Sequence, residues 1–130
     1  MCRRFELRTK FNNLPKALKQ DYPPGLRSKY EIQTQINPLD PVLVIKNEGK
    51  MKTTFMSWGF ISPWAKNPFD KSLQRPYNAR SETVFGKKLF QDSWRNKRCL
   101  IPATGFIEKG FRIRKKDYAT FWLGGIWSRW

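Results

Sequence analysis

The chain has 130 residues, a length that fits a single domain spanning residues 1–130. Hydrophobic residues make up 39% of the chain and aromatic residues 15%, enough to build a core, which argues against a wholly disordered protein. Lys and Arg number 26 against 10 Asp and Glu, and the resulting net charge of +16 favours a polyanionic partner such as a nucleic acid.

The N-terminal part of the chain predicts an extended segment followed by a helix. Residues 1–8 alternate loosely between polar and apolar side chains, as in a segment that leads into the core. Apolar residues follow at helical spacing over 11–18, with Asn13 as the expected cap and Pro15 tolerated in the first turn. The Pro- and Gly-containing residues 21–25 predict the turn that ends this helix.

The middle of the chain predicts two paired strands, a loop and a second helix. The β-branched run 41–45 predicts a buried strand, residues 47–50 a turn, and residues 52–58 the returning strand. Residues 63–75 contain Pro and basic side chains and predict an irregular loop. Apolar residues near helical spacing predict a helix over 83–94, which a glycine within it weakens.

The last third of the chain predicts short strands separated by glycines. These strands are expected over residues 99–101, 106–108, 118–123 and 125–127. Gly105 and Gly110 mark the turns around the second of them. The whole pattern predicts a β-rich α+β domain with a few short helices, and not an alternating parallel fold.

Cysteine and histidine usage limits the chemistry. Cys2 and Cys99 are too few for a secreted disulfide framework. Nothing resembles a signal peptide, and no apolar run approaches the roughly 20 residues of a membrane span, so we expect a cytoplasmic protein without membrane contact. The sequence has no His, which excludes His-based catalysis and most zinc sites within these residues, and we expect no metal and no cofactor.

Cys2 is the first candidate for chemistry. Its small side chain favours removal of Met1, which would leave an α-amine and a thiol on adjacent carbons. The amine has an ordinary pKa of about 8 and the thiol one of about 8.5, so both have reactive fractions near neutral pH. An aldehyde can form an imine with this amine, and the thiol can then close a five-membered thiazolidine. A cysteine that is second in the chain by chance is the alternative.

Residues 78–83 form a polar cluster with two interpretations. The guanidinium of Arg80 suits bidentate phosphate binding, and Asn78 can orient a sugar hydroxyl or a carbonyl oxygen. The alternative is a polar turn that caps the following helix, with Ser81 as the N-cap.

Glu108 is a lone carboxylate next to a strongly basic stretch. It follows two apolar residues of a predicted strand, where a carboxylate can serve as general acid or base. A simple ion pair with one of the neighbouring cations is the alternative.

The segment 58–64 carries aromatic residues in a loop with lysines nearby. Aromatic faces beside cations suit the stacking of single-stranded bases. Core packing is the alternative, and it fits Trp58 better than Trp64.

Together and in this order, these clusters resemble the SOS response-associated peptidase (SRAP) family. The matching stretches are Met1-Cys2-Arg3-Arg4-Phe5, Trp58-Gly59-Phe60-Ile61-Ser62-Pro63-Trp64, Asn78 to Thr83, Arg98 to Glu108, and Gly125 to Trp130. Each motif alone is weak, but the ordered set is highly specific and spans essentially the whole chain.

The resemblance implies a function for the site residues. Cys2, after loss of Met1, would link covalently to the open-ring aldehyde of an abasic site in single-stranded DNA. Asn78 would position the reacting group and Glu108 would handle protons. Arg4 and Arg80 would hold flanking phosphates, and the aromatic loop with Trp64 would wedge against unstacked bases. The family name also implies an autopeptidase activity that fits removal of Met1. We expect a monomer, and a DNA partner implies association with the nucleoid.

The sequence departs from the family pattern in several places. Arg3 replaces the usual Gly, Ser62-Pro63 reverses the usual order, and Lys109 replaces the usual Trp. Family domains also continue past the position of Trp130, through a His-x-Arg-Met-Pro block that supplies a catalytic His. We therefore expect an incomplete SRAP-like domain of mostly antiparallel strands whose C-terminal part is missing, with unpaired sheet edges and part of its core exposed.

Three functions remain open from the sequence. The first is covalent capture of abasic DNA by Cys2, and the second is non-catalytic binding of single-stranded nucleic acid. The third is a thiol peptidase with Cys2 as nucleophile, which ranks last because no His is present to activate the thiol. A ribosomal or structural role would fit the charge but would not explain the ordered motifs.

Overall fold

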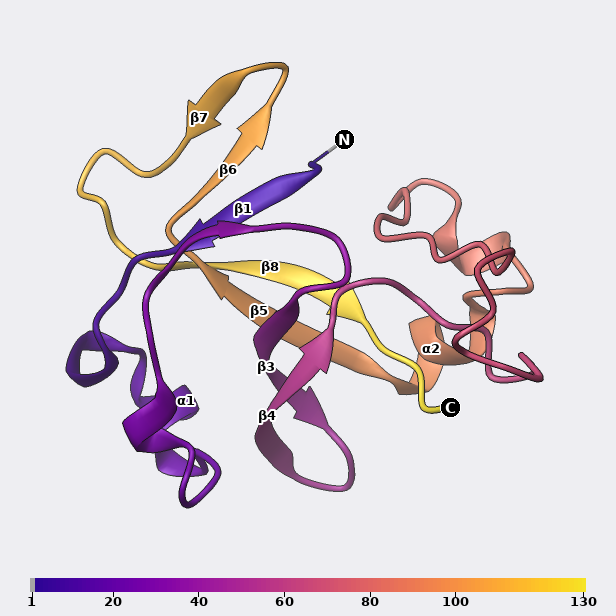
Figure 1. The fold of residues 1–130 in the computed structure, drawn as a ribbon, viewed down its shortest axis with the longest axis horizontal. Helices are drawn as coiled ribbons and strands as arrows, with labels where there is room; N and C mark the ends of the chain where they lie inside the picture. Colours follow the sequence, from indigo (N-terminus) through magenta and orange to yellow (C-terminus); the bar gives the residue numbers. More distant parts are fainter. Residues whose placement is uncertain (1) are drawn as a thin grey trace.

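The computed structural model describes residues 2–130, which form two four-stranded antiparallel sheets, with the short helices α1 and α2 at the periphery (Figure 1). In the first sheet the order is β2-β1-β6-β7, formed by Gln33–Ile36, Arg4–Leu7, Gly105–Glu108 and Phe111–Ile113. In the second the order is β4-β3-β5-β8, formed by Met51–Ser57, Pro41–Asn47, Arg98–Ala103 and Phe121–Ile126. The α+β class and the antiparallel pairing predicted from the sequence are confirmed.

The helical elements are all short. They are α1 (Lys16–Gln20), α2 (Gln91–Asn96) and the 3-10 turns η1 (Phe11–Asn13), η2 (Arg27–Lys29) and η3 (Val84–Gly86). Within residues 2–130, no helix has the length and apolar character needed to cross a bilayer.

The β3–β4 hairpin confirms the paired strands predicted in the middle of the chain. Its register runs without a break from the Pro41–Ser57 pair to the Asn47–Met51 pair. The connecting turn contains Gly49 at a φ of 78°, a left-handed conformation that glycine adopts without steric cost. Local sequence therefore determines this hairpin, because a β-branched run and a glycine turn both act over a few residues.

The core lies between the two sheets and α1. Its most completely buried large side chains come from β1, α1, β2 and β3: Leu7, Leu18, Ile36, Leu43 and Val44. The hydroxyl of Thr53 on β4 donates a hydrogen bond of 3.1 Å to the carbonyl oxygen of Leu18, which attaches α1 to the second sheet. Burying side chains of this size stabilises the fold by roughly 1.5–3 kcal/mol each.

Both helix predictions need correction. Asn13 lies in η1 and Pro15 occupies the position before α1, with no side chain capping the helix, so Asn13 is not its cap. The helix predicted over 83–94 is split into η3 and α2. Gly86 destabilises a continuous helix, because glycine is unfavourable in a helix interior. Val84 and Phe90 are both buried against Phe60 in a small separate hydrophobic cluster.

The strand predictions near the C-terminus also need correction. Residues 118–123 and 125–127 were expected to form two strands, but β8 is a single strand that runs through Gly124 and Gly125. A Cβ at Gly125 would lie 2.9 Å from the Sγ of Cys99, so glycine here permits close approach to β5 and does not end the strand. Pairing with β5 over its full length keeps β8 continuous.

An apolar hollow of about 890 Å³ opens on the second sheet, where β8 and the loops around Trp58 and Tyr77 border it. The indole nitrogen of the buried Trp127 lines it and has no hydrogen-bond partner among residues 2–130.

Candidate functional site

Cys2 lies two residues before Arg4, the first residue of β1. The pairing of Arg4 with Ile107 continues toward the end of β6, where Glu108 is the last residue. The Cys2 thiol is half-buried and donates a hydrogen bond of 3.0 Å to the carbonyl oxygen of Arg4. Strand pairing therefore brings the N-terminal cysteine next to Glu108. The expected removal of Met1 concerns a residue outside those described.

Asn78 reaches Cys2 from a distant part of the chain. Its side-chain amide donates a hydrogen bond of 2.5 Å to the carbonyl oxygen of Cys2. The loop that carries Asn78 is held by Trp58, whose indole nitrogen donates to the carbonyl oxygen of Tyr77 over 2.7 Å. The Trp58 ring packs edge-on against Phe5 of β1, with ring centroids 5.1 Å apart. Core packing thus fixes the position of Asn78 relative to Cys2.

An open pocket of about 430 Å³ lies beside these two residues. It is lined by Cys2 and by five consecutive residues: Asn78, Ala79, Arg80, Ser81 and Glu82. The main chain turns here, since the carbonyl oxygen of Arg80 accepts hydrogen bonds from the amides of Thr83 and Val84. Ser81 lines the pocket, and no side chain caps the following η3 turn, so the capping alternative for Ser81 is wrong.

The environment of Cys2 raises the pKa of its thiol. Burial is the largest cause, and the negative charge of Glu108 acts in the same direction. Hydrogen bonds with the main chain at Arg4 and Ile107 oppose the rise. Glu108 does not line the pocket, but it is close enough for its charge to act on the thiol. Cys2, Asn78 and Glu108 therefore form one neighbourhood.

The remaining predicted site residues lie at different distances from this neighbourhood. Arg80 lines the pocket with its side chain exposed, and Arg4 is exposed on β1 two positions after Cys2. Trp64 is 61% exposed on its loop and is not among the residues that line the pocket. Trp58 packs in the core as its alternative interpretation predicted, whereas Trp64 presents an aromatic surface to solvent.

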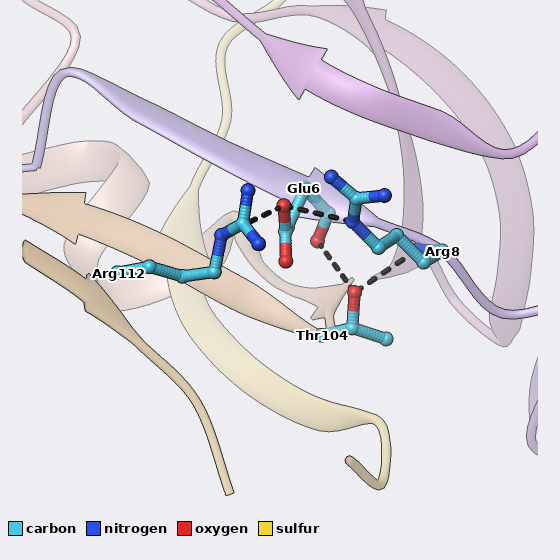
Figure 2. Close-up of polar contacts among 4 residues, drawn as sticks. All are labelled: Glu6, Arg8, Thr104 and Arg112. Carbon is cyan, nitrogen blue, oxygen red and sulfur yellow. Dashed lines mark hydrogen bonds and ion pairs between the residues drawn. The ribbon is translucent and has the colours of Figure 1, made fainter.

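Sequence reasoning missed a buried carboxylate beneath the site. Glu6 is only 4% exposed, and its carboxylate lies 3.0 Å from the Nε of Arg8 and 3.6 Å from the Nε of Arg112 (Figure 2). The main-chain oxygen of Glu6 accepts hydrogen bonds from both the amide and the hydroxyl of Thr104. The alternation of residues 5–7 suggests an exposed Glu6, but its register partner Gly105 leaves room for the carboxylate.

Comparison with known proteins identifies the family. The family model described as SOS response associated peptidase (SRAP) matches residues 1–130. The chain belongs to the SRAP family. Among SRAP relatives, abasic site processing protein YoaM of Bacillus subtilis is 32% identical over 142 residues, covering 100% of this chain and 60% of its own length. Abasic site processing protein YoqW of Bacillus phage SPbeta is 31% identical, with 100% and 61% covered.

Solved structures support the SRAP fold. A crystal structure of a protein from Bordetella bronchiseptica matches with a TM-score of 0.74 at 22% identity, covering 99% of this chain and 64% of that one. A protein from Bacteroides thetaiotaomicron matches with a TM-score of 0.71 at 23% identity, covering 96% and 59%. This SRAP chain thus spans about three fifths of the length of the curated relatives it matches.

Proposed function

We propose that this protein senses and processes abasic sites by binding single-stranded DNA and forming a covalent thiazolidine crosslink through Cys2 once Met1 is removed. The observation that carries this proposal is the hydrogen bond of 2.5 Å from Asn78 to the carbonyl oxygen of Cys2, at the edge of an open pocket. The names of the relatives, abasic site processing proteins, support the same function.

The proposed reaction has two bond-forming steps. The α-amine of Cys2 attacks the aldehyde of the ring-opened deoxyribose, and loss of one water leaves a carbon–nitrogen double bond. The Cys2 sulfur then adds to that carbon, the π electrons move to nitrogen, and the thiol proton is transferred to it. The product is a five-membered ring containing both nitrogen and sulfur. No external oxidant or reductant is needed.

Asn78 and Glu108 have distinct roles in this scheme. By holding the carbonyl group of Cys2, Asn78 restricts rotation of the residue that carries both nucleophiles, which favours attack. Glu108 serves as general acid and base, because water loss requires proton donation and thiol addition requires proton removal. Its charge already acts on the Cys2 thiol, which supports a position within reach of these protons.

Three further residues bind the DNA strand in this proposal. Arg80, in the wall of the pocket, pairs with a phosphate next to the lesion. Arg4 contacts a second phosphate from β1. Trp64 stacks on an unpaired base, which accounts for a preference for single strands.

We also propose that removal of Met1 is an activity of the protein itself, as the family name suggests. The thiol of Cys2 belongs to the residue whose amide bond to Met1 must break, which makes it the candidate nucleophile. Intact mass measurement of freshly purified wild-type and Glu108→Gln protein tests this step. Because Glu108 would also supply the proton transfers of this step, retention of Met1 only in the variant is expected, whereas complete removal in both contradicts removal at this site.

The crosslink is tested with a single-stranded oligonucleotide that contains one abasic site. Wild-type protein is expected to give a shifted band on a denaturing gel without any reductant. Cys2→Ala keeps an α-amine but lacks the thiol, so it should give a band only when borohydride traps the imine. No band with Met1-free wild-type protein, or an untrapped band in Cys2→Ala, contradicts the proposal.

A second function, non-catalytic binding of single-stranded nucleic acid, is favoured by exposed aromatic residues on a cationic protein. Trp64 is 61% and Phe69 is 85% exposed on the same loop, in a chain with a net charge of +16. In that case Met1 is retained and undamaged DNA binds as well as abasic DNA. Mass measurement and a binding comparison of the two DNAs separate these functions.

A further inference from the structure

A basic surface element adjoins the candidate site and has no role in the reaction above. It comprises residues 109–118, called here the basic hairpin, which form the turn after β6, β7 and the following loop. All ten residues are exposed. Their charged side chains are five cations, Lys109, Arg112, Arg114, Lys115 and Lys116, and one acid, Asp117. Such a density of cations on one short element favours a polyanion over a neutral partner.

Two aromatic residues accompany these cations. Phe111 is 74% exposed and Tyr118 is 66% exposed. The guanidinium carbon of Arg114 lies 3.9 Å from the centre of the Tyr118 ring, so the two side chains stack. Tyr118 has a φ of 59°, in the left-handed region that a bulky residue rarely adopts. Backbone strain of this kind clusters at active sites and ligand-binding segments, which agrees with a binding role for residues that also carry exposed cations and aromatic rings.

Strand register connects the basic hairpin to the site. Phe111 on β7 is the direct partner of Glu108 on β6, the residue whose charge acts on Cys2. The buried carboxylate of Glu6 holds Arg112 at 3.6 Å and thereby attaches β7 to β1 (Figure 2). The hairpin is therefore held next to Cys2 by both main-chain pairing and an ion pair.

The hairpin and the pocket loop lie on opposite sides of the N-terminus. Figure 1 shows β6 and β7 on one side of the N-terminal end of β1 and the loops between β4 and α2 on the other. Arg80 lines the pocket from those loops. A single strand with its lesion at Cys2 would thus meet a different basic element on each side.

We propose that the basic hairpin is a second single-strand-binding element, which holds the DNA on the Glu108 side of Cys2. Phe111 stacks on an unpaired base, and Lys115 and Lys116 contact phosphates. Arg114, stacked on Tyr118, presents its guanidinium to a further phosphate. This inference rests on the proposed function and deepens it, because it names the part of the protein that binds the single strand on one side of the abasic site.

Binding of undamaged single-stranded DNA by the full chain tests the hairpin without any covalent chemistry. Lys115→Ala/Lys116→Ala should weaken binding and reduce the slope of log affinity against log salt by about 1.4, since each contacted phosphate contributes roughly 0.7 for single strands. Phe111→Ala should weaken binding at least about fivefold through loss of stacking. The matched control is Lys50→Ala/Lys52→Ala, which removes the same charge from the β3–β4 hairpin.

Unchanged affinity and salt slope in the hairpin variants, or equal losses in the control, would overturn the inference. If Phe111→Ala weakened the binding of duplex DNA as much as that of single-stranded DNA, the inference would also be overturned. The bases of a duplex are already stacked on one another and leave no face for Phe111 to stack on. Thermal unfolding of each variant is measured alongside, and Phe111→Tyr is a second variant that keeps the ring if Phe111→Ala is unstable.

Two abasic oligonucleotides test on which side of the lesion the hairpin binds the DNA. One extends mainly to the 5′ side of the abasic site and the other mainly to the 3′ side. At protein concentrations below saturation, Lys115→Ala/Lys116→Ala should slow crosslinking of only one of them. Equal slowing of both contradicts the assignment of a side. If wild-type protein forms no crosslink, the proposed function fails, but the binding measurements on undamaged DNA still decide whether the hairpin binds single strands.

Discussion

The side-chain amide of Asn78 donates a hydrogen bond of 2.5 Å to the main-chain carbonyl oxygen of Cys2, although 76 positions separate the two residues in the chain. This bond joins the N-terminal segment to a loop that the core residue Trp58 holds in place through Tyr77. The position of Cys2, the proposed nucleophile, therefore depends on the packing of the Trp58 loop as well as on the pairing of β1.

Replacing Asn78 should slow crosslinking without abolishing it. Asn78→Ala removes a neutral hydrogen bond whose net value is about 0.5–1.5 kcal/mol, so a decrease in rate of about twofold to tenfold is expected. Asn78→Asp should be slower still, because a carboxylate cannot donate to the Cys2 carbonyl and repels DNA. The control is Asn96→Ala on α2, where the side-chain amide donates a hydrogen bond to Asp92 at the surface. The rates are measured in a single-turnover gel assay. Rates for both Asn78 variants equal to those of wild type and the control would contradict this role.

The two cysteines should differ sharply in reactivity. Burial raises the pKa of the Cys99 thiol to about 11, with the charge of Lys46 opposing the rise. At pH 8 only about one Cys99 in a thousand is then a thiolate, and the thiolate is the reactive form. Cys2 is half-buried, so iodoacetamide should modify it first. Peptide mass spectrometry after brief alkylation measures this order, and modification of Cys99 in folded protein at a similar rate would contradict it.

Glu108 should set the pH at which Cys2 becomes reactive. Its negative charge disfavours the thiolate and so contributes to the raised pKa of Cys2. Glu108→Gln removes that charge, which lowers the pKa and moves the midpoint of the alkylation rate to lower pH. Crosslinking should nevertheless be slower in this variant, because the carboxylate that accepts protons and returns them during the reaction is lost.

Glu82→Gln is the matched control for Glu108. Glu82 lines the pocket but is not among the charges that act on the Cys2 thiol. Alkylation profiles should therefore coincide for Glu82→Gln and wild type. A shift of the same size in both variants would indicate a general field effect and would remove the specific role of Glu108.

Local sequence predicts the parts of this fold that local forces determine. The β3–β4 hairpin follows from a β-branched run, a glycine turn and a returning strand. Strand β2 was missed because three of the four residues in Gln33–Ile36 are polar, and strand β7 because Phe111–Ile113 has only three residues and lies within a charged stretch. Their strand conformation comes from pairing with β1 and β6, which a single segment cannot reveal.

In the candidate site, too, local sequence reveals some features and long-range contacts determine the others. Cys2 stands out from the chemistry of an aminothiol, but its proximity to Asn78 and Glu108 was expected only from the resemblance to the SRAP family. Glu6 escaped notice because strand alternation predicts an exposed side chain there. The only signal in the sequence was Gly105, whose lack of a side chain makes room for a carboxylate on the facing strand.

That relationship gives a final prediction about stability. A Cβ at Gly105 would lie 2.8 Å from the carboxylate Oε1 of Glu6, so Gly105→Ala must displace a side chain that two arginines hold. Losing these charge-assisted contacts should lower the free energy of unfolding by about 1.5–3 kcal/mol. Urea denaturation measures the change.

A double-mutant cycle separates this cause from a general intolerance of alanine in β6. Glu6→Ala removes the displaced carboxylate, so adding Gly105→Ala to it should cost much less than in the wild-type background. The contact of the new methyl group with the main-chain oxygen of Ile113, at 3.3 Å, would remain. If the loss of unfolding free energy in the double variant equals the sum of the losses in the two single variants, alanine at position 105 destabilises the backbone itself. In that case Gly105 is not needed to make room for Glu6.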